Sequence, residues 1–243
     1  MPAATDILIR KIKEHTRLSR DETDGLRGLN FTARRLASGE DAIRQGDRPN
    51  VSILVIEGMV GRYHTRPSGG RQYLSFHIAG DMPDSQALFL EQMDHSVCAV
   101  GPTLIGLVTH QELVALIKQQ VTIGFALWRE TLIDAAIFRE AITNNASRPV
   151  RARMAHFFCE QYYRAKASGL ADSSFCTLPI SQIQLGEALG MSVVTTNRTL
   201  QSLRKSGAVE FRGGVLNVRN WKRLADIGEF DPRYLHLRKQ ISG

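Results

Sequence analysis

Residues 110–143 constrain the fold more than any other part of the sequence, because they form the longest segment with no proline and only one glycine. Such a segment predicts a long helix. Its apolar residues occupy more than one face. One row begins at Phe125 and Trp128 and continues at alternating spacings of three and four residues, and a second row holds Ala126, Ile133 and Ile137. A helix that is apolar on more than one face needs two packing partners.

We expect one partner to be the preceding part of the chain and the other to be the same helix of a second subunit, along a coiled-coil-like seam. Arg139 completes the row that would form this seam. The alternative is a helix buried wholly within one monomer. The residues predicted for the dimer interface are Phe125, Trp128, Leu132, Ala135 and Ile142.

Residues 31–108 differ from this helical segment in their sequence pattern. Short β-branched or alternating runs such as "VSILVIEG" and "RQYLSFHI" are separated by turn-forming stretches such as "QGDRPN" and "AGDMPD". Runs of this length, punctuated by Gly, Asp and Pro, predict an antiparallel sandwich, roll or barrel. A short amphipathic helix at residues 5–17 is expected to precede it.

The stretch "TNNASRPV", residues 143–150, predicts a hinge. Asn144 and Asn145 tolerate the left-handed backbone of a helix end, and Pro149 suits the first turn of the next helix. We therefore expect a sensor domain at residues 1–109, a dimerisation helix at 110–143 and a separate C-terminal domain at 144–243.

Charge is distributed unevenly along the chain. Residues 144–243 contain 15 Lys and Arg against 7 Asp and Glu, whereas residues 1–143 contain 16 against 17. The whole positive excess therefore lies in the C-terminal part, which indicates a polyanion-binding module joined to a part that does not bind polyanions. A basic surface that serves only solubility is the alternative.

The segment "LPISQIQLGEALGMSVVTTNRTLQSLRKSGAVEFRGGVLNV", residues 178–218, carries the clearest motif. Ser181 and Gln184 have capping-box spacing, Gly190 permits a tight turn, and Ser192 caps a second helix from about residue 193 to 206. Two short helices around such a turn predict a helix-turn-helix. The following "AVEFRGGVLNV" predicts two strands that form a wing around Arg212.

The second helix of this motif has an inward face with Leu200, Leu203 and the methyl group of Thr196. On the opposite face, Arg198 can pair with guanine O6 and N7, and residues near the helix start can bind phosphate oxygens. Asn197 suits adenine or a phosphate, and Val194 suits a thymine methyl group. The residues predicted to contact DNA are Ser181, Ser192, Val193, Val194, Thr195, Asn197, Arg198, Gln201, Lys205 and Arg212.

The order of short helix, β-roll, long helix, hinge and winged helix-turn-helix resembles the Crp/Fnr superfamily of bacterial transcription regulators over essentially the whole chain. The matching stretches are "SGEDAIRQGD", "IEGMVGRY", "FHIAGDM" and "LGEALGMSVVTTNRTLQSLRKSGAVE". The resemblance implies an α+β fold with a cyclic-nucleotide-binding-like β-roll, and a homodimer that binds a two-fold-related DNA site and acts with RNA polymerase. In this family the residue aligned with Arg198 contacts a base.

The sequence departs from the best-known members of the family in the effector pocket. Those members carry Gly-Glu for the ribose and Arg-Ser for the cyclic phosphate, where this chain has Asp84-Ser85 and His95-Ser96. A neutral imidazole offers neither the permanent charge nor the two-point geometry of a guanidinium. We therefore expect cyclic AMP to bind weakly or not at all, and the effector is unknown. The pocket candidates are Asp84, Ser85, Gln86, His95 and Ser96.

In the recognition helix, Val193 and Val194 stand where those members carry Arg and Glu, so the preferred half-site need not be the same. The version "GDMPD…MDHS" resembles a branch that is common in alphaproteobacteria.

Other function classes have little sequence support. Metal-dependent cupins also use β-rolls, but their closely spaced His-x-His pair with a following Glu is missing, so we predict no catalytic residue and no metal site. Haem ligation by His77 or His95 has no motif behind it, and no cysteine precedes Cys98 to hold an N-terminal iron–sulfur cluster. No cofactor is therefore predicted.

The three cysteines are predicted to be reduced, packed thiols. The sequence contains neither a secretion signal nor a membrane span, so we expect a cytoplasmic protein. The competing interpretation is a small-anion or cyclic-nucleotide binding module whose C-terminal domain docks a protein partner.

Overall fold

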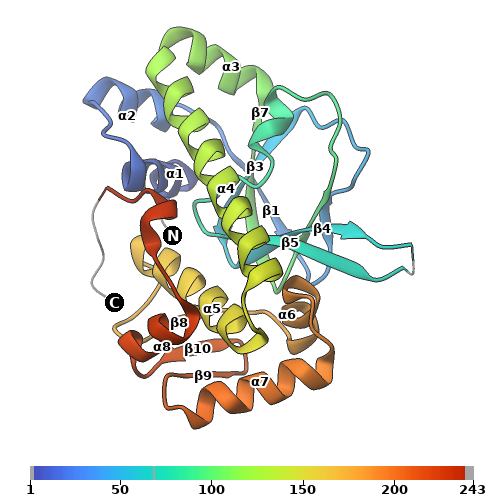
Figure 1. Cartoon of the computed structure of the whole chain (residues 1–243). Coiled ribbons are helices and arrows are strands. Elements are labelled where there is room, and N and C mark those ends of the chain that lie inside the picture. The colour runs from blue at the N-terminus through green and yellow to red at the C-terminus, as the bar shows by residue number, and fades with distance from the viewer. Residues whose placement is uncertain (1–2, 68, 239–243) are drawn as a thin grey trace. The chain divides into compact units, whose positions relative to one another are not determined.

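The computed structural model describes residues 3–67 and 69–238 and confirms the predicted α+β class (Figure 1). The chain divides into two compact units, one ending at Asp134 and the other beginning at Ala135. This division falls inside a helix. The three-part domain division expected from the sequence stays a prediction.

The first unit contains an antiparallel roll preceded by two helices. Its helices are α1 (Ala4–His15), α2 (Arg20–Arg27), the 3-10 helix η1 (Ser85–Leu88), α3 (His110–Gln119) and the start of α4 (Val121–Ser147). Its strands are β1 (Thr32–Leu36), β2 (Asp41–Ile43), β3 (Val51–Glu57), β4 (Met59–Thr65), β5 (Arg71–Ile78), β6 (Ser96–Ala99) and β7 (Thr103–Thr109). Within the described residues these strands form sheets of order β1-β7-β3 and β2-β6-β4-β5.

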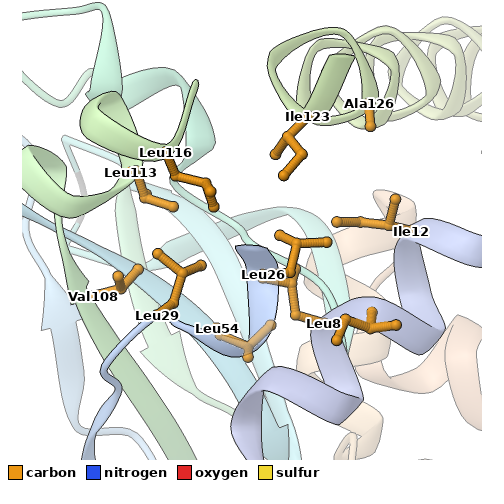
Figure 2. Close-up of a cluster of buried hydrophobic side chains, with 11 residues drawn as sticks. Leu8, Ile12, Leu26, Leu29, Leu54, Val108, Leu113, Leu116, Ile123 and Ala126 are labelled. Atoms are coloured by element: carbon orange, nitrogen blue, oxygen red, sulfur yellow. The ribbon is translucent and has the colours of Figure 1, made fainter. Parts of the chain in front are cut away.

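Strand β3 shows how the roll is placed between two cores. Successive residues of a strand point to opposite faces. Ile53 and Val55 accordingly lie in one buried cluster with Val60 and Ile105, whereas Leu54 lies in another. The second cluster joins α1 and α2 to α3 and the first turns of α4 (Figure 2).

The long helix predicted for residues 110–143 is divided at Gln120 into α3 and α4. Gln120 is the C-cap of α3, and its side-chain amide donates a hydrogen bond of 3.1 Å to the carbonyl of Asp21. A Cβ atom on Gly25 would lie within 2.8 Å of that amide, so a larger residue there would displace the Gln120 side chain. The break therefore coincides with a contact between Gln120 and a distant segment, which no local signal reveals.

Helix α4 also extends beyond its predicted end, because it runs through the expected hinge to Ser147. Asn144 and Asn145 are helical and do not adopt the left-handed backbone. Their amides donate to the carbonyls of Arg153 and Ala188 at 3.1 and 3.3 Å. Pro149 occupies the N-cap of the next helix, one position before the predicted first turn.

The second unit is a winged helix-turn-helix, as predicted. It contains α5 (Val150–Ala167), β8 (Phe175–Thr177), α6 (Gln182–Leu189), α7 (Val193–Lys205), β9 (Val209–Arg212), β10 (Val215–Val218), α8 (Trp221–Gly228) and the 3-10 helix η2 (Pro232–Leu235). The described strands form a sheet of order β8-β10-β9. Fully buried Phe158, Leu185, Leu203 and Leu216 place its core between α5, the helix-turn-helix and the sheet.

The three cysteines are buried free thiols, in agreement with the sequence interpretation. Burial raises the pKa of Cys176 to about 12 and also raises the pKa of Cys98 and Cys159. These thiols are therefore protonated and unreactive near neutral pH, since the thiolate is the reactive form.

Candidate nucleic-acid interface and effector pocket

The turn between α6 and α7 is built from short-range hydrogen bonds and two glycines. Ser181 and Gln184 form the predicted capping box, and Gly190 ends α6 in the left-handed region at φ 65°. Gly186 allows the helices to approach, because a Cβ atom there would lie 2.8 Å from the carbonyl oxygen of Met191. Ser192 caps α7 by accepting a hydrogen bond from the Thr195 N–H. The local sequence thus fixes the angle at which α7 leaves the turn.

Helix α7 has the two faces that the sequence predicted. Thr196 and Leu203 are fully buried, while Leu200 is partly buried. Val194, Arg198 and Gln201 are exposed on the opposite side. Within the described residues, no hydrogen bond or ion pair engages the side chains of Arg198 and Gln201. This face therefore presents a fixed cation and an amide that are available to a ligand.

The remaining DNA-contact candidates lie around this face. Val193 and Lys205, at the two ends of α7, are exposed, and so is Ser181 at the start of α6. Asn197 and Thr195 are partly buried, and the Thr195 hydroxyl lies 2.9 Å from that of Ser192. The wing strands β9 and β10 pair with Arg212 beside the turn, where Gly213 and Gly214 both have positive φ.

The position of the helix-turn-helix on α5 is set by Arg153. Its guanidinium donates to the carbonyl of Leu189 at 2.8 Å, which satisfies a carbonyl at the C-terminal end of α6. A second hydrogen bond of 3.2 Å reaches the carbonyl of Arg148. The guanidinium of Arg153 thus ties the end of α6 to the segment that precedes α5.

Helix α4 exposes the apolar row predicted for a dimer seam. Trp128 and Leu132 are 61% and 52% exposed, which is high for apolar side chains in the middle of a long helix. Phe125 and Ile142 are exposed to a similar degree, and Ala135 is partly buried. The neighbouring row is buried within the chain at Ala126 and Ile133. The two faces of the helix thus differ as the predicted arrangement requires.

The five effector candidates do not line one cavity. The Asp84 carboxylate is fully buried and accepts hydrogen bonds from the Ile53 N–H at 2.8 and 3.1 Å. Burial raises its pKa to about 7, although the bond from Ile53 and the charge of Arg62 act in the opposite direction. Asp84 therefore connects η1 to β3 and has no surface left for a ligand.

The other candidates are also engaged by the protein. Ser85 donates to the Met82 carbonyl at 2.9 Å, and the Ser96 hydroxyl accepts from the Gln45 N–H at 2.9 Å. The His95 ring lies 2.6 Å from Asp94 on one side and 3.3 Å from Gln86 on the other. Burial and the charge of Arg62 lower the pKa of His95, although Asp94 opposes them. The imidazole is therefore neutral at neutral pH.

Arg62 is a buried cation of the roll that the sequence interpretation did not select. Its guanidinium is buried in the roll, donates to the Pro83 carbonyl at 2.6 Å and forms an ion pair with Asp134 of α4. The signal was available, because Arg62 lies two positions after the buried Val60 and therefore on the same face of β4. A guanidinium is thus present in the roll, but it comes from another strand and is already paired.

Two wider features concern residues 3–67 and 69–238. None of their helices has the length and apolar character that crossing a bilayer requires. No cluster of His, Cys, Asp and Glu side chains among them is suited to hold a metal ion.

Comparison with known proteins gives matches in both parts of the chain. A cyclic nucleotide-binding domain family matches residues 33–120, and a Crp-like helix-turn-helix domain family matches residues 152–227. The chain is 20% identical over 210 residues to the fumarate and nitrate reduction regulatory protein of Vibrio cholerae, covering 86% of this chain and 84% of that protein. It is 22% identical over 201 residues to the transcriptional activator FnrA of Stutzerimonas stutzeri, covering 83% and 82%.

Solved structures show the same fold. The structure of FixK2 from Bradyrhizobium japonicum is similar with a TM-score of 0.73 and 24% identity, over 82% of this chain and 98% of that chain. The c-di-GMP-responsive global regulator CLP of Xanthomonas campestris is similar with a TM-score of 0.62 and 16% identity, over 82% and 99%.

Proposed function

The chain belongs to the Crp/Fnr superfamily of DNA-binding transcription regulators, and we propose that it acts as a homodimer that recognises a pseudo-palindromic site through α7. The observation that carries the proposal is the exposed face of α7, where the side chains of Arg198 and Gln201 are free of partners within the described residues. That face is held by buried contacts on the other side of the helix.

We assign sequence recognition to the centre of this face. Arg198 is placed to donate two hydrogen bonds to a guanine, which is worth about 1–3 kcal/mol of discrimination against another base. Asn197, Gln201 and the apolar Val193 and Val194 contact neighbouring bases. The alternatives at this position are phosphate contacts, which would add affinity without discriminating between sequences.

We assign backbone contacts to the edges of the same surface. Ser181 and Ser192 begin helices, where N–H groups and hydroxyls favour phosphate oxygens. Thr195 contributes a further hydroxyl in the first turn of α7. Lys205 and Arg212 supply positive charge at the end of α7 and in the wing. These contacts position the protein and make binding sensitive to salt.

We assign dimerisation to the exposed row of α4. Contact between this row and the same row of a second subunit removes a continuous apolar strip from water. The strip consists of Phe125, Trp128, Leu132, Ala135 and Ile142. A two-fold axis along this seam presents two α7 helices to successive major grooves, about 34 Å apart.

The proposed regulator does not use cyclic AMP as its effector. Asp84 and His95 are occupied by the protein's own groups, and the buried guanidinium of Arg62 is neutralised by Asp134. A cyclic phosphate that enters the roll would have to displace the Asp134 carboxylate from Arg62. None of the five candidate residues offers it a fixed positive charge in exchange. The site therefore favours internal pairing over an anionic ligand.

The remaining assignments follow from the family. A regulator of this kind acts on bacterial DNA in the cytoplasm and alters transcription by contact with RNA polymerase, which we include as a partner. Its family consists of regulators that are not enzymes, and we assign no catalytic residue.

Selection of duplexes from a random pool by the purified full-length protein tests the proposal. We expect an enriched inverted repeat, and we expect Arg198→Ala to lose preference at one base pair of each half-site. The exposed Arg233→Ala in η2 serves as a matched control and should keep that preference. Enrichment of no sequence by the wild-type protein would refute sequence-specific recognition.

A further inference from the structure

A cavity of about 570 Å³ lies in the first unit, outside the interior of the roll. Its walls come from η1, including the effector candidates Ser85 and Gln86, from α3 and from α4, and Ser52 of β3 also lines it. Ser52 lies two positions before Leu54, on the strand face that packs on the helices, so the cavity borders the cluster shown in Figure 2. Leu113 belongs to both.

The chemistry of the walls limits what the cavity accepts. The lining is mainly apolar, with Leu88, Phe89, Leu127 and Trp128 among its members, and none of the described residues that line it is acidic or basic. An anion such as a cyclic nucleotide would lose its hydration here without gaining a counter-charge. The volume lies within the range of roughly 300–1,000 Å³ that is usual for small-molecule sites.

Four polar residues line the cavity, and the side chains of Ser85, Gln86 and Thr131 already have hydrogen-bond partners, whereas Ser52 differs from them. The residue is fully buried, and its hydroxyl has no hydrogen-bond partner within the described chain. A buried unpaired hydroxyl destabilises the fold, so a partner that satisfies it is favoured. An apolar side chain inserted by a second subunit would fill space but would leave this hydroxyl unpaired. A small molecule with one hydrogen-bonding group satisfies both requirements.

We propose that this cavity binds a neutral, largely apolar small molecule whose single polar group hydrogen-bonds to Ser52. The ligand class is an uncharged aromatic or medium-chain aliphatic compound with one arylamine, hydroxyl or carbonyl group. The site also touches α4, because Trp128 lines the cavity and belongs to the proposed dimer seam. A regulatory effect of the ligand rests on the proposed function, but binding itself does not.

The test uses the full chain and three probes that differ in one group each. N-phenyl-1-naphthylamine is neutral and has one N–H donor, 1-phenylnaphthalene lacks the donor, and 1-anilinonaphthalene-8-sulfonate adds a negative charge. Binding is measured by the fluorescence of the two amine probes, by quenching of the tryptophan fluorescence, to which Trp128 and Trp221 both contribute, and for 1-phenylnaphthalene by competition. We expect the neutral amine to bind at least about 100-fold more tightly than the sulfonate.

Two variants and one control separate the contributions. Ser52→Ala should weaken N-phenyl-1-naphthylamine by about five- to tenfold and leave 1-phenylnaphthalene unchanged, which also shows that the variant is folded. Thr131→Phe places a ring on the cavity wall and should weaken both neutral probes. Leu170→Ala, an exposed leucine outside the cavity, should change neither.

Three results would overturn the proposal. The sulfonate could bind as tightly as the neutral amine, or Ser52→Ala could weaken all probes alike. Alternatively, the neutral probe could bind only to a variant that has become monomeric, which would show that a second subunit fills the cavity. Because no DNA is present, these results are independent of sequence recognition, and a failure of DNA binding would leave the cavity result intact.

Discussion

Leu132→Asp is the substitution that most directly probes the α4 seam. Leu132 lies in the middle of the exposed row and, unlike Trp128, does not line the cavity described above. Its side chain is 52% exposed in the single chain, so about half of its surface remains to be buried by a partner. The substitution removes that apolar surface and places a carboxylate at the centre of the seam.

The magnitude follows from this exposure. Full burial of a leucine side chain contributes about 1.5–3 kcal/mol, so the exposed half contributes about 1 kcal/mol per subunit and about 2 kcal/mol per dimer. Burial of the two carboxylates opposes dimerisation by a further several kcal/mol. The counter-charge that the row offers is Arg139, which lies about two helical turns away. The dissociation constant of the dimer should therefore rise by more than about 1,000-fold.

Sedimentation equilibrium over a range of protein concentrations measures this change. Leu132→Ala should raise the dissociation constant by about 30-fold, which separates lost burial from the buried charge. Leu170→Asp, which alters an exposed leucine in the second unit, should leave the wild-type value. An unaltered dimer for Leu132→Asp would show that the seam lies elsewhere, and the assignment of all five interface residues would then fall.

Further predictions concern DNA, the roll and pH. Arg198→Ala should reduce the binding free energy on the best site by about 1–3 kcal/mol and flatten the preference at one base pair. Lys205→Ala should weaken binding to specific and random duplexes equally. If Arg198→Ala also weakened specific and random duplexes equally, Arg198 would contact the DNA backbone instead of a base. Titration calorimetry near neutral pH should detect no cyclic AMP binding, and micromolar affinity that disappears in His95→Ala would contradict this. Burial raises the pKa of Glu130 to about 8, so its contribution to folding stability is lost as pH rises from its usual pKa of about 4.3 toward 8. Glu130→Gln should therefore gain on the order of 4 kcal/mol in unfolding free energy over the wild type at pH 8 and almost nothing near pH 4, and equal unfolding free energies across this range would refute the burial argument.

Local signals in the sequence were sufficient for the helix-turn-helix. Three local features have the predicted geometry: the capping box of Ser181 and Gln184, the left-handed Gly190 and the helix cap at Ser192. Each depends only on residues three or four positions away. The same is true of the apolar rows of α4, whose exposed and buried faces follow directly from helical periodicity.

Features that depend on distant contacts were not predictable in this way. The break at Gln120 coincides with its bond to Asp21, about 100 residues earlier in the chain. The pairing of Arg62 with Asp134 needs the roll and α4 in place before either residue has a partner. Asp84, chosen for an effector by its position in a family pattern, instead binds the backbone of β3.

Hydroxyl-radical footprinting on a selected duplex tests the central claim most directly. The account predicts two protected half-sites of opposite orientation, with centres about 10–10.5 base pairs apart on the duplex, at saturating wild-type protein. The protection should decline steeply as salt rises, because phosphate contacts release counterions. Protection of a single half-site at saturation, or uniform protection of unrelated duplexes, would contradict recognition by a symmetric pair of α7 helices.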